Sequence, residues 1–311
     1  MKKVGFIYDD IFLRHEAPQW HPERKERLVS VVNKLKASDI WNNLIHIKPI
    51  RAEYADIEAV HTHEYIEQIK AAKPGYADPD TYISEGSIEA ALYAAGAVIE
   101  AINRCKSKEI ERAFCAVRPP GHHAEADRAM GFCIFNNVAI GARYAQKAGY
   151  RKILIIDFDV HHGNGTQHIF DEDDTVFYFS THQYPHYPGT GNTSETGKGK
   201  GKGFTYNIPM ISGSGNKEYF SAYNEVLPYL AKKFRPDLIL VSAGYDLHFS
   251  DPLAGINVSD EGIRSIVKGI ISCSSHVTHH LSLPFIFALE GGYDLEALSE
   301  SVLITIKEML T

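Results

Sequence analysis

Short apolar runs alternate with longer helix-like runs along this 311-residue chain. Strand-like and helix-like segments that alternate in this way are typical of a mainly parallel sheet covered on both faces. The clearest strand-like runs are Val4–Tyr8, Ala113–Val117, Lys152–Ile156, Val176–Phe179, Leu238–Ser242 and Pro284–Leu289. The sequence therefore predicts an α/β fold with a mostly parallel sheet.

The helix-like runs carry apolar residues at helical spacing, as Leu28, Val31, Val32 and Leu35 do within Pro22–Lys36. The other predicted helices are Ser87–Arg104, Asn137–Lys147, Lys217–Lys233, Asp260–His280 and Leu295–Leu310. No linker or internal repeat separates them. We therefore expect one domain over residues 1–311.

The segment Thr181–Gly203 is rich in Gly, Tyr and Pro and contains alternating Gly and Lys at residues 197–203. Because strand-like runs flank it within one domain, it is predicted to be a loop near the rim of a site rather than a linker.

Acidic and imidazole groups follow directly after the apolar run that ends at Ile156. Alternation along a strand puts Asp157, Asp159 and His161 on one face at its carboxyl end, where ligands bind in open α/β sheets. Carboxylate oxygens and an imidazole nitrogen suit a divalent cation such as zinc. The alternative is an ordinary strand-to-loop turn with a helix-capping Asp.

A further carboxylate, Asp246, comes just past the run Leu238–Ser242. Asp159, His161 and Asp246 together make three ligands with an open fourth position, which is typical of a catalytic metal. Zn²⁺ is the expected cofactor, with Fe²⁺ as the alternative because such sites accept both ions. Taken alone, Asp246 fits a turn or capping residue equally well.

Two more loops carry groups that can take part in chemistry. His122 and His123 lie in the rigid segment Arg118–Ala124 (RPPGHHA), where they can bind a metal or transfer protons beside one. Tyr293 follows the glycines of Glu290–Asp294, which permit a sharp turn, and its hydroxyl can face a developing oxyanion. The alternatives are surface histidines and a tyrosine that packs at a strand end.

Together these segments resemble the histone deacetylase family. The matching motifs, in the order of the family, are Arg118–Ala124, Gly131–Asn137, Asp157–Thr166, Pro188–Gly191, Ser242–Asp246 and Glu290–Tyr293. The resemblance extends from about Tyr8 to Leu310, and residues 21–28 and 78–82 are most similar to the class II branch and its bacterial and archaeal relatives.

The resemblance implies the arginase/deacetylase fold, a single doubly wound sheet flanked by helices on both faces. Arginases share this fold but bind two metals through additional Asp and His residues. In this chain Leu247, His248 and Phe249 follow Asp246, so one catalytic metal is expected.

The implied activity is zinc-dependent hydrolysis of the amide of Nε-acetyl-lysine, or of a related short acyl-lysine, in a protein or peptide. By resemblance, Asp159, His161 and Asp246 are the zinc ligands. His123 is the general base and then the general acid, and His122 assists electrostatically. Tyr293 donates its hydroxyl to the tetrahedral oxyanion.

The resemblance also assigns partners to the two histidines. Asp157 matches the position that pairs with His122. Asn164 matches the position that pairs with His123, where class I members carry Asp. Because a neutral amide stabilises an imidazolium less than a carboxylate does, His123 is expected to be less basic than in class I enzymes.

A structural K⁺ or Na⁺ ion is a further expectation from the resemblance. It would be held by Asp157 and Ser180, with backbone carbonyls of Asp159, His161 and Thr181. An apolar tunnel for the lysine stem is also implied, with Phe132 and Tyr187 as its walls. The expected tunnel residues are Gly131, Phe132, Tyr187, Leu253 and, at the rim, Asp80.

Other functions fit less well. Polyamine-selective relatives carry a Glu near the tunnel mouth, but this chain has Leu253 at the matching position, so acyl-lysine is favoured over an acetylated polyamine or another N-acyl amine. A non-enzymatic acyl-lysine reader would be expected to lack a catalytic residue. A two-metal ureohydrolase would need further ligands. The acyl-chain length and the oligomeric state stay open.

Composition narrows the class of protein further. The chain is 44% hydrophobic and 23% charged, as in ordinary globular proteins, and its formal charge of −7 argues against nonspecific nucleic-acid binding. No run reaches the roughly 18 apolar residues of a membrane span, and the start does not resemble a signal peptide. Four widely spaced cysteines suit a reducing compartment. A cytoplasmic enzyme with no nucleic-acid or membrane partner is therefore expected.

Overall fold

An eight-stranded sheet forms the centre of the computed structural model, which describes residues 2–277 and 283–311. The strand order is β2-β1-β5-β10-β9-β6-β7-β8, and the neighbouring strands pair in parallel. The strands are β1 (Val4–Ile7), β2 (Ile45–Ile47), β5 (Arg112–Cys115), β6 (Ile153–Asp157), β7 (Val176–Gln183), β8 (Thr205–Met210), β9 (Leu238–Ala243) and β10 (Phe285–Leu289). The predicted parallel α/β sheet is confirmed.

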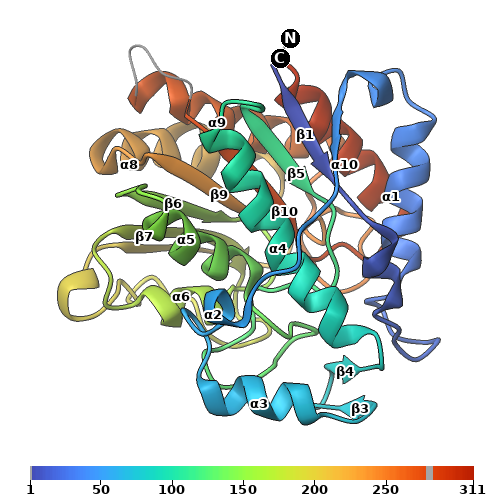
Figure 1. Cartoon of the computed structure of the whole chain (residues 1–311). Helices are drawn as coiled ribbons and strands as arrows, with labels where there is room; N and C mark the ends of the chain where they lie inside the picture. The colour runs from blue at the N-terminus through green and yellow to red at the C-terminus, as the bar shows by residue number, and fades with distance from the viewer. Residues whose placement is uncertain (1, 278–282) are drawn as a thin grey trace.

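Helices cover both faces of this sheet (Figure 1). On one face α4 (Ser87–Lys106) packs against α5 (Asn137–Lys147). On the other face α1 (Glu26–Lys36), α10 (Leu295–Met309), α9 (Asp260–Val277) and α8 (Leu227–Phe234) contact one another in series. Because both faces are covered, strands such as β6 and β9 are buried along their whole length, which explains their unbroken apolar runs.

The remaining elements are short. The helices are α2 (Tyr54–Ile57), α3 (His63–Ala71), α6 (Asn164–Phe170) and α7 (Asn216–Ser221), and β3 (Gly75–Tyr76) pairs with β4 (Tyr82–Ile83) in a small antiparallel sheet. Among the described residues, no helix is long and apolar enough to cross a membrane.

The predicted loop Thr181–Gly203 begins later in the structure than in the sequence analysis. Strand β7 continues through Gln183 because Thr181, His182 and Gln183 pair with Ile208, Pro209 and Met210 of β8. The strand β8 was not expected, because only part of it is buried and its residues do not form an apolar run.

Two predicted helices differ clearly from the structure. The first begins at Glu26 rather than Pro22. The run Lys217–Lys233 is divided into α7, a π-helical turn at Ala222–Val226, and α8. Helix α9 (Asp260–Val277) agrees with the predicted helix Asp260–His280 as far as it is described, and residues 278–280 lie outside the described residues.

The register of the central strands decides which loops meet. Asp157 of β6 is aligned with Ser180 of β7 and with Ser242 of β9, and Ala288 of β10 is aligned with Cys115 of β5. The loops that leave the carboxyl ends of β5, β6, β9 and β10 therefore meet at one edge of the sheet. This is the edge where parallel α/β sheets bind ligands.

Candidate active site

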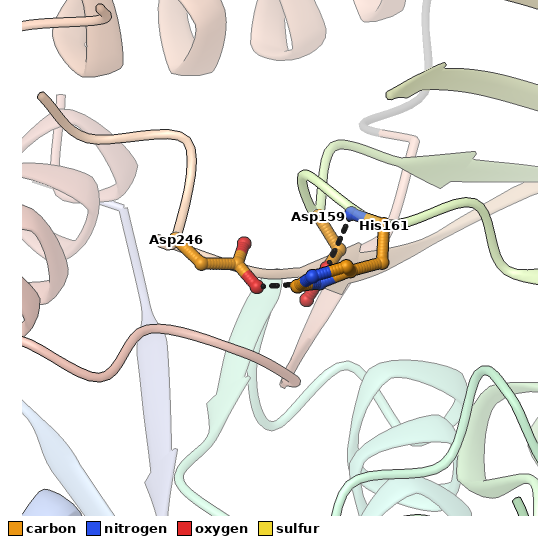
Figure 2. A group of neighbouring side chains, drawn as sticks. All are labelled: Asp159, His161 and Asp246. Carbon is orange, nitrogen blue, oxygen red and sulfur yellow. Dashed lines mark hydrogen bonds and ion pairs between the residues drawn. The ribbon is translucent and has the colours of Figure 1, made fainter. Parts of the chain in front are cut away.

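Two carboxylates and an imidazole converge at this edge. Asp159 and His161 follow β6, and Asp246 follows β9 on the neighbouring strand. Their ligating atoms lie within 4.8 Å of one another, and all three side chains are buried. Figure 2 shows them pointing toward a common centre, with the Nδ1 of His161 3.1 Å from both Asp159 Oδ1 and Asp246 Oδ2.

The charges of this cluster fit a bound divalent cation. Burial and the neighbouring charge of Asp159 raise the pKa of Asp246, so the ionised form of Asp246 is costly beside a second carboxylate. A divalent cation bound between the carboxylates would remove this cost. Two carboxylate oxygens and one imidazole nitrogen with space for further ligands suit a catalytic metal of the zinc or iron type.

Backbone groups hold the two carboxylates in place. The N–H of Gly291 donates to Asp159 Oδ2 at 2.8 Å, and the N–H of Val160 donates to Asp246 Oδ1 at 2.9 Å. A Cβ atom at Gly291 would lie 2.2 Å from Asp246 Oδ2. The glycine after Glu290 therefore allows the backbone of this loop to approach the cluster of Asp159, His161 and Asp246 closely.

His122 is paired with a carboxylate. Its Nδ1 donates to Asp157 Oδ2 at 3.0 Å, and the hydroxyl of Tyr178 donates to the same oxygen at 3.1 Å. Burial alone would lower the pKa of His122, but the charges of Asp157 and Asp159 outweigh burial and raise this pKa to about 10. His122 is therefore held in its charged form.

His123 is paired with an amide. Its Nδ1 donates to Asn164 Oδ1 at 2.7 Å. Burial, followed by the nearby positive charges of His122 and His161, holds the pKa of His123 well below its usual value. The two adjacent histidines therefore differ in charge, and His123 is the neutral imidazole of the pair.

Tyr293 is held from two sides. The guanidinium of Arg27 lies 4.9 Å from the centre of the Tyr293 ring and donates to the carbonyl of Gly292 at 2.6 Å. From the other side, Asp251 Oδ2 accepts the backbone N–H of Tyr293 at 2.6 Å. These contacts fix both the ring and the backbone of the residue.

A narrow cavity of about 100 Å³ connects these groups with the surface. His123, His161 and Tyr293 line it together with all five predicted tunnel residues, Asp80, Gly131, Phe132, Tyr187 and Leu253. The ring of Phe132 meets Tyr293 edge-on at 5.9 Å, and the ring of Tyr187 meets His123 edge-on at 5.1 Å. The structure therefore brings the predicted wall and three of the predicted site residues, His123, His161 and Tyr293, around one space.

The predicted structural-cation residues also lie together. Asp157 and Ser180 are neighbours on paired strands. The hydroxyl of Ser180 donates to His182 Nδ1 at 2.8 Å, and the hydroxyl of Thr181 lies 2.8 Å from that of Tyr223. Both hydroxyls thus have protein partners.

Several buried charged residues that support the site were not identified from the sequence. Glu23 Oε1 accepts a hydrogen bond from Arg27 at 2.9 Å, and both oxygens of Glu23 pair with the guanidinium of Arg118. Because Arg27 contacts the Tyr293 loop and Arg118 begins the His122 loop, Glu23 joins these two loops. Glu290 Oε2 accepts the N–H of Gly121 at 2.6 Å. The only sequence signal for Arg27 is a charged residue beside the apolar stripe of its helix, which is weak evidence by itself.

Glu125 was also missed. It lies directly after the loop that carries the two histidines, and its carboxylate accepts the amide N–H of Asn164 at 2.6 Å. Its position two residues from His123 is the one signal that could have drawn attention to it.

Comparison with known proteins agrees with this arrangement. The family model described as "Histone deacetylase domain" matches residues 21–309. A probable deacetylase of Archaeoglobus fulgidus is 38% identical over 297 residues, covering 94% of this chain and 82% of that protein. A probable deacetylase of Methanothermobacter thermautotrophicus is 43% identical over 288 residues, covering 90% and 83%.

A plant protein and a solved structure extend the likeness. Histone deacetylase 5 of Arabidopsis thaliana is 35% identical over 331 residues, and this chain spans 49% of its length. The crystal structure of the HDA15 HD domain superimposes with a TM-score of 0.92 at 35% identity, covering 98% of this chain and 90% of that one. This likeness confirms the arginase/deacetylase fold. The chain belongs to the histone deacetylase family of hydrolases.

Proposed function

We propose that this protein is a metal-dependent deacylase that hydrolyses the amide of Nε-acetyl-lysine, or of a related short acyl-lysine, in a protein or peptide. The observation that supports this most directly is the shared cavity. A metal-binding side chain (His161), a neutral imidazole (His123) and a tyrosine (Tyr293) line the same narrow space.

In this proposal Asp159, His161 and Asp246 hold Zn²⁺, with Fe²⁺ as the alternative. When bound, the ion polarises the acyl carbonyl and acidifies a water molecule in the site. The neutral state of His123 suits it to take the proton of that water as it attacks the carbonyl carbon. As the C–N bond breaks, His123 returns the proton to the lysine nitrogen, and a carboxylate and a free amine leave.

The remaining groups stabilise charge in this scheme. His122, kept positive by Asp157, lies beside the developing negative charge, and the Tyr293 hydroxyl donates a hydrogen bond to the oxyanion. Asn164 orients His123. Groups of this kind typically contribute factors of about 10² to 10⁴ each. The loss of any one of these groups should therefore slow the reaction measurably.

The walls of the cavity suggest the substrate class. Phe132 and Tyr187 offer aromatic surfaces to an alkyl stem, Gly131 leaves space beside them, and Leu253 adds an apolar rim. An acetylated polyamine is the second candidate, because Asp80 brings a carboxylate to the same cavity. The absence of a charge at Leu253 favours acyl-lysine.

Three further proposals accompany this one. A K⁺ or Na⁺ ion is bound by Asp157 and Ser180, with backbone carbonyls of Asp159, His161 and Thr181. Residues 1–311 act as one catalytic domain, which the core cluster that spans the described residues supports. The protein acts in the cytoplasm, where its four buried free cysteines stay reduced.

The test is a turnover assay on purified, zinc-reconstituted protein with acetyl-lysine peptides, longer acyl-lysine peptides and N-acetylated polyamines. We expect the protein to deacylate the peptides, and Tyr293→Phe should lower the rate of this reaction by about 100-fold or more. Preferred turnover of the polyamines would replace acyl-lysine with the second candidate. Metal-loaded protein that acts on none of them would contradict the deacylase proposal.

A further inference from the structure

Asn164 stands between the catalytic histidine and a buried carboxylate. Its Oδ1 accepts from His123 Nδ1 at 2.7 Å, and its Nδ2 donates to Glu125 Oε1 at 2.6 Å. Asn164 is 2% exposed and Glu125 is 5% exposed, so water does not compete for these contacts. The amide is therefore held at both ends by groups of the protein.

The two ends of an amide are chemically different, and a carboxylate can distinguish them. An ionised carboxylate only accepts hydrogen bonds, so the NH₂ end of Asn164 must face Glu125. The carbonyl end then faces His123, whose Nδ1 must carry the proton. In a neutral imidazole the other nitrogen, Nε2, is then free to accept a proton.

Other contacts keep Glu125 in its acceptor state. His168 Nδ1 donates to its two oxygens at 2.9 and 3.1 Å, and an Arg128 nitrogen lies 3.5 Å away. Burial alone would raise the pKa of Glu125, but the hydrogen bonds from His168 and Asn164 outweigh it and lower this pKa. The carboxylate thus stays ionised beside Asn164.

We propose that Glu125 is a positioning residue, which orients the Asn164 amide and thereby selects the Nδ1–H tautomer of His123. An Asp in place of Asn164 would not need such a partner, because both of its oxygens accept hydrogen bonds. An Asn needs one, because its reversed orientation would present N–H to His123 and favour the wrong tautomer. The catalytic consequence rests on the proposed function, whereas the tautomer is a property of the protein itself.

The chain contains a matched arrangement outside the cavity. His162 Nε2 donates to Gln167 Oε1 at 3.0 Å, and Gln167 Nε2 donates to Glu195 Oε2 at 2.7 Å. This is again a histidine, an amide and a carboxylate, but His162 does not line the cavity of about 100 Å³ that the described residues form. Glu195→Ala is therefore the control for Glu125→Ala.

The first experiment compares steady-state kinetics of these two variants in zinc-loaded protein. We expect Glu125→Ala to lower kcat by about 10- to 100-fold, part of the contribution of a general base, with KM changed by less than about threefold. Glu195→Ala should leave kcat within about threefold of the wild type. Equal effects of the two variants, or an unchanged kcat in Glu125→Ala, would overturn the inference.

The second experiment exchanges the amide and the carboxylate. Asn164→Asp alone places two carboxylates 2.6 Å apart and should lower kcat at least about tenfold. Adding Glu125→Gln restores an N–H donor between them, and the double variant should recover to within about fivefold of the wild type. A merely structural Glu125 would instead make the second substitution add to the loss, and that result would refute the inference.

The third experiment reads the tautomer directly and needs no turnover. In ¹⁵N-histidine-labelled, zinc-loaded protein, NMR should show the His123 ring protonated at Nδ1, with the signal assigned through His123→Ala. Glu125→Ala, or Glu125→Gln if the alanine variant does not fold, should shift it toward a mixture of tautomers. A wild-type ring protonated at Nε2, or a tautomer unaffected by Glu125, would refute the inference. The expected spectra together with no turnover of any acyl amine would refute only the proposed function.

Discussion

His122 and His123 are adjacent in the chain and almost equally buried, with exposed fractions of 2% and 4%. Nevertheless, the pKa of His122 is raised to about 10, whereas that of His123 is held well below its usual value. Burial disfavours the charged form of both rings. The difference comes from the neighbouring charges: Asp157 and Asp159 raise the pKa of His122, whereas His123 has only an amide at Nδ1 and lies beside the positive charges of His122 and His161.

This comparison shows how one loop can carry two imidazoles with different tasks. A histidine that stays charged can stabilise negative charge but cannot accept a proton. A histidine that stays neutral can accept one. The loop Arg118–Ala124 supplies both rings, and residues from β6 and the start of α6 decide which is which.

The largest effect is expected from removing the neutral ring. His123→Ala should lower kcat by about 10³- to 10⁴-fold, because it removes the proposed proton acceptor. His122→Ala should have a smaller effect, of about 10²-fold, because it removes only a nearby charge. Kinetics on an acetyl-lysine peptide would check this order, and a larger loss in His122→Ala would reverse the roles.

The difference between the two histidines can also be abolished by giving both of them an amide partner. Asp157→Asn should lower kcat by about 10²-fold, because His122 loses the carboxylate that keeps it charged.

The same substitution should change the pH dependence of stability in metal-free protein. The folded pKa of His122, about 10, lies above its unfolded value of 6.5. Its stabilising contribution is therefore complete below pH 6.5 and is lost as the pH rises toward 10, by at most about 1.4 kcal/mol per pH unit. Urea unfolding between pH 6.5 and 10 should show that the free energy of unfolding falls less steeply with pH in Asp157→Asn than in the wild type. Identical slopes for the two proteins would contradict the pairing of a charged His122 with Asp157.

A third buried histidine sharpens the comparison, because its partners are backbone groups. His61 donates to the carbonyl of Glu125 at 2.9 Å and accepts the N–H of Asn136 at 2.9 Å, and burial lowers its pKa to about 4. As the pH drops, His61 is protonated in the unfolded chain before it is protonated in the folded one. The free energy of unfolding should therefore fall between pH 6.5 and 4, by about 3 kcal/mol in total. His61→Gln should lack this component in acid unfolding curves. An unchanged curve would show that His61 is not its source.

The smallest effect is expected at the wall of the cavity. Tyr187 meets His123 with its ring, at 5.1 Å between ring centres. Tyr187→Phe keeps this ring, so kcat and KM should each stay within about threefold of the wild type. A larger change in kcat would mean that the hydroxyl of Tyr187 takes part in the reaction as well.

The parts of the site that lie in short sequence motifs could be predicted well. Asp159, His161 and Asp246 each follow an apolar run, and the rule that parallel strands end at one edge was enough to bring them together. The strand β8 could not be predicted in the same way, because a partly buried edge strand needs no apolar run. The extension of β7 to Gln183 depends on β8, so it was missed for the same reason.

The supporting carboxylates could not be predicted because their function depends on contacts between distant segments. Glu23 and Arg118 are 95 residues apart, and Glu125 and Asn164 are 39 residues apart. A charged residue near an apolar stripe or after a motif is usually solvated, and no local pattern shows that it is buried with a partner.

The sequence by itself determined the main alternation of strands and helices, the residue types of the candidate metal-binding cluster and the identity of the two histidines. These properties depend on local pattern, because hydrophobic periodicity and strand ends are visible within a few residues. The resemblance implied the partners of the two histidines, but only the tertiary structure shows the charges that surround each ring and which way the Asn164 amide points. Protonation and amide orientation depend on the nearest charges and hydrogen-bond partners in space, which come from segments far apart in the chain.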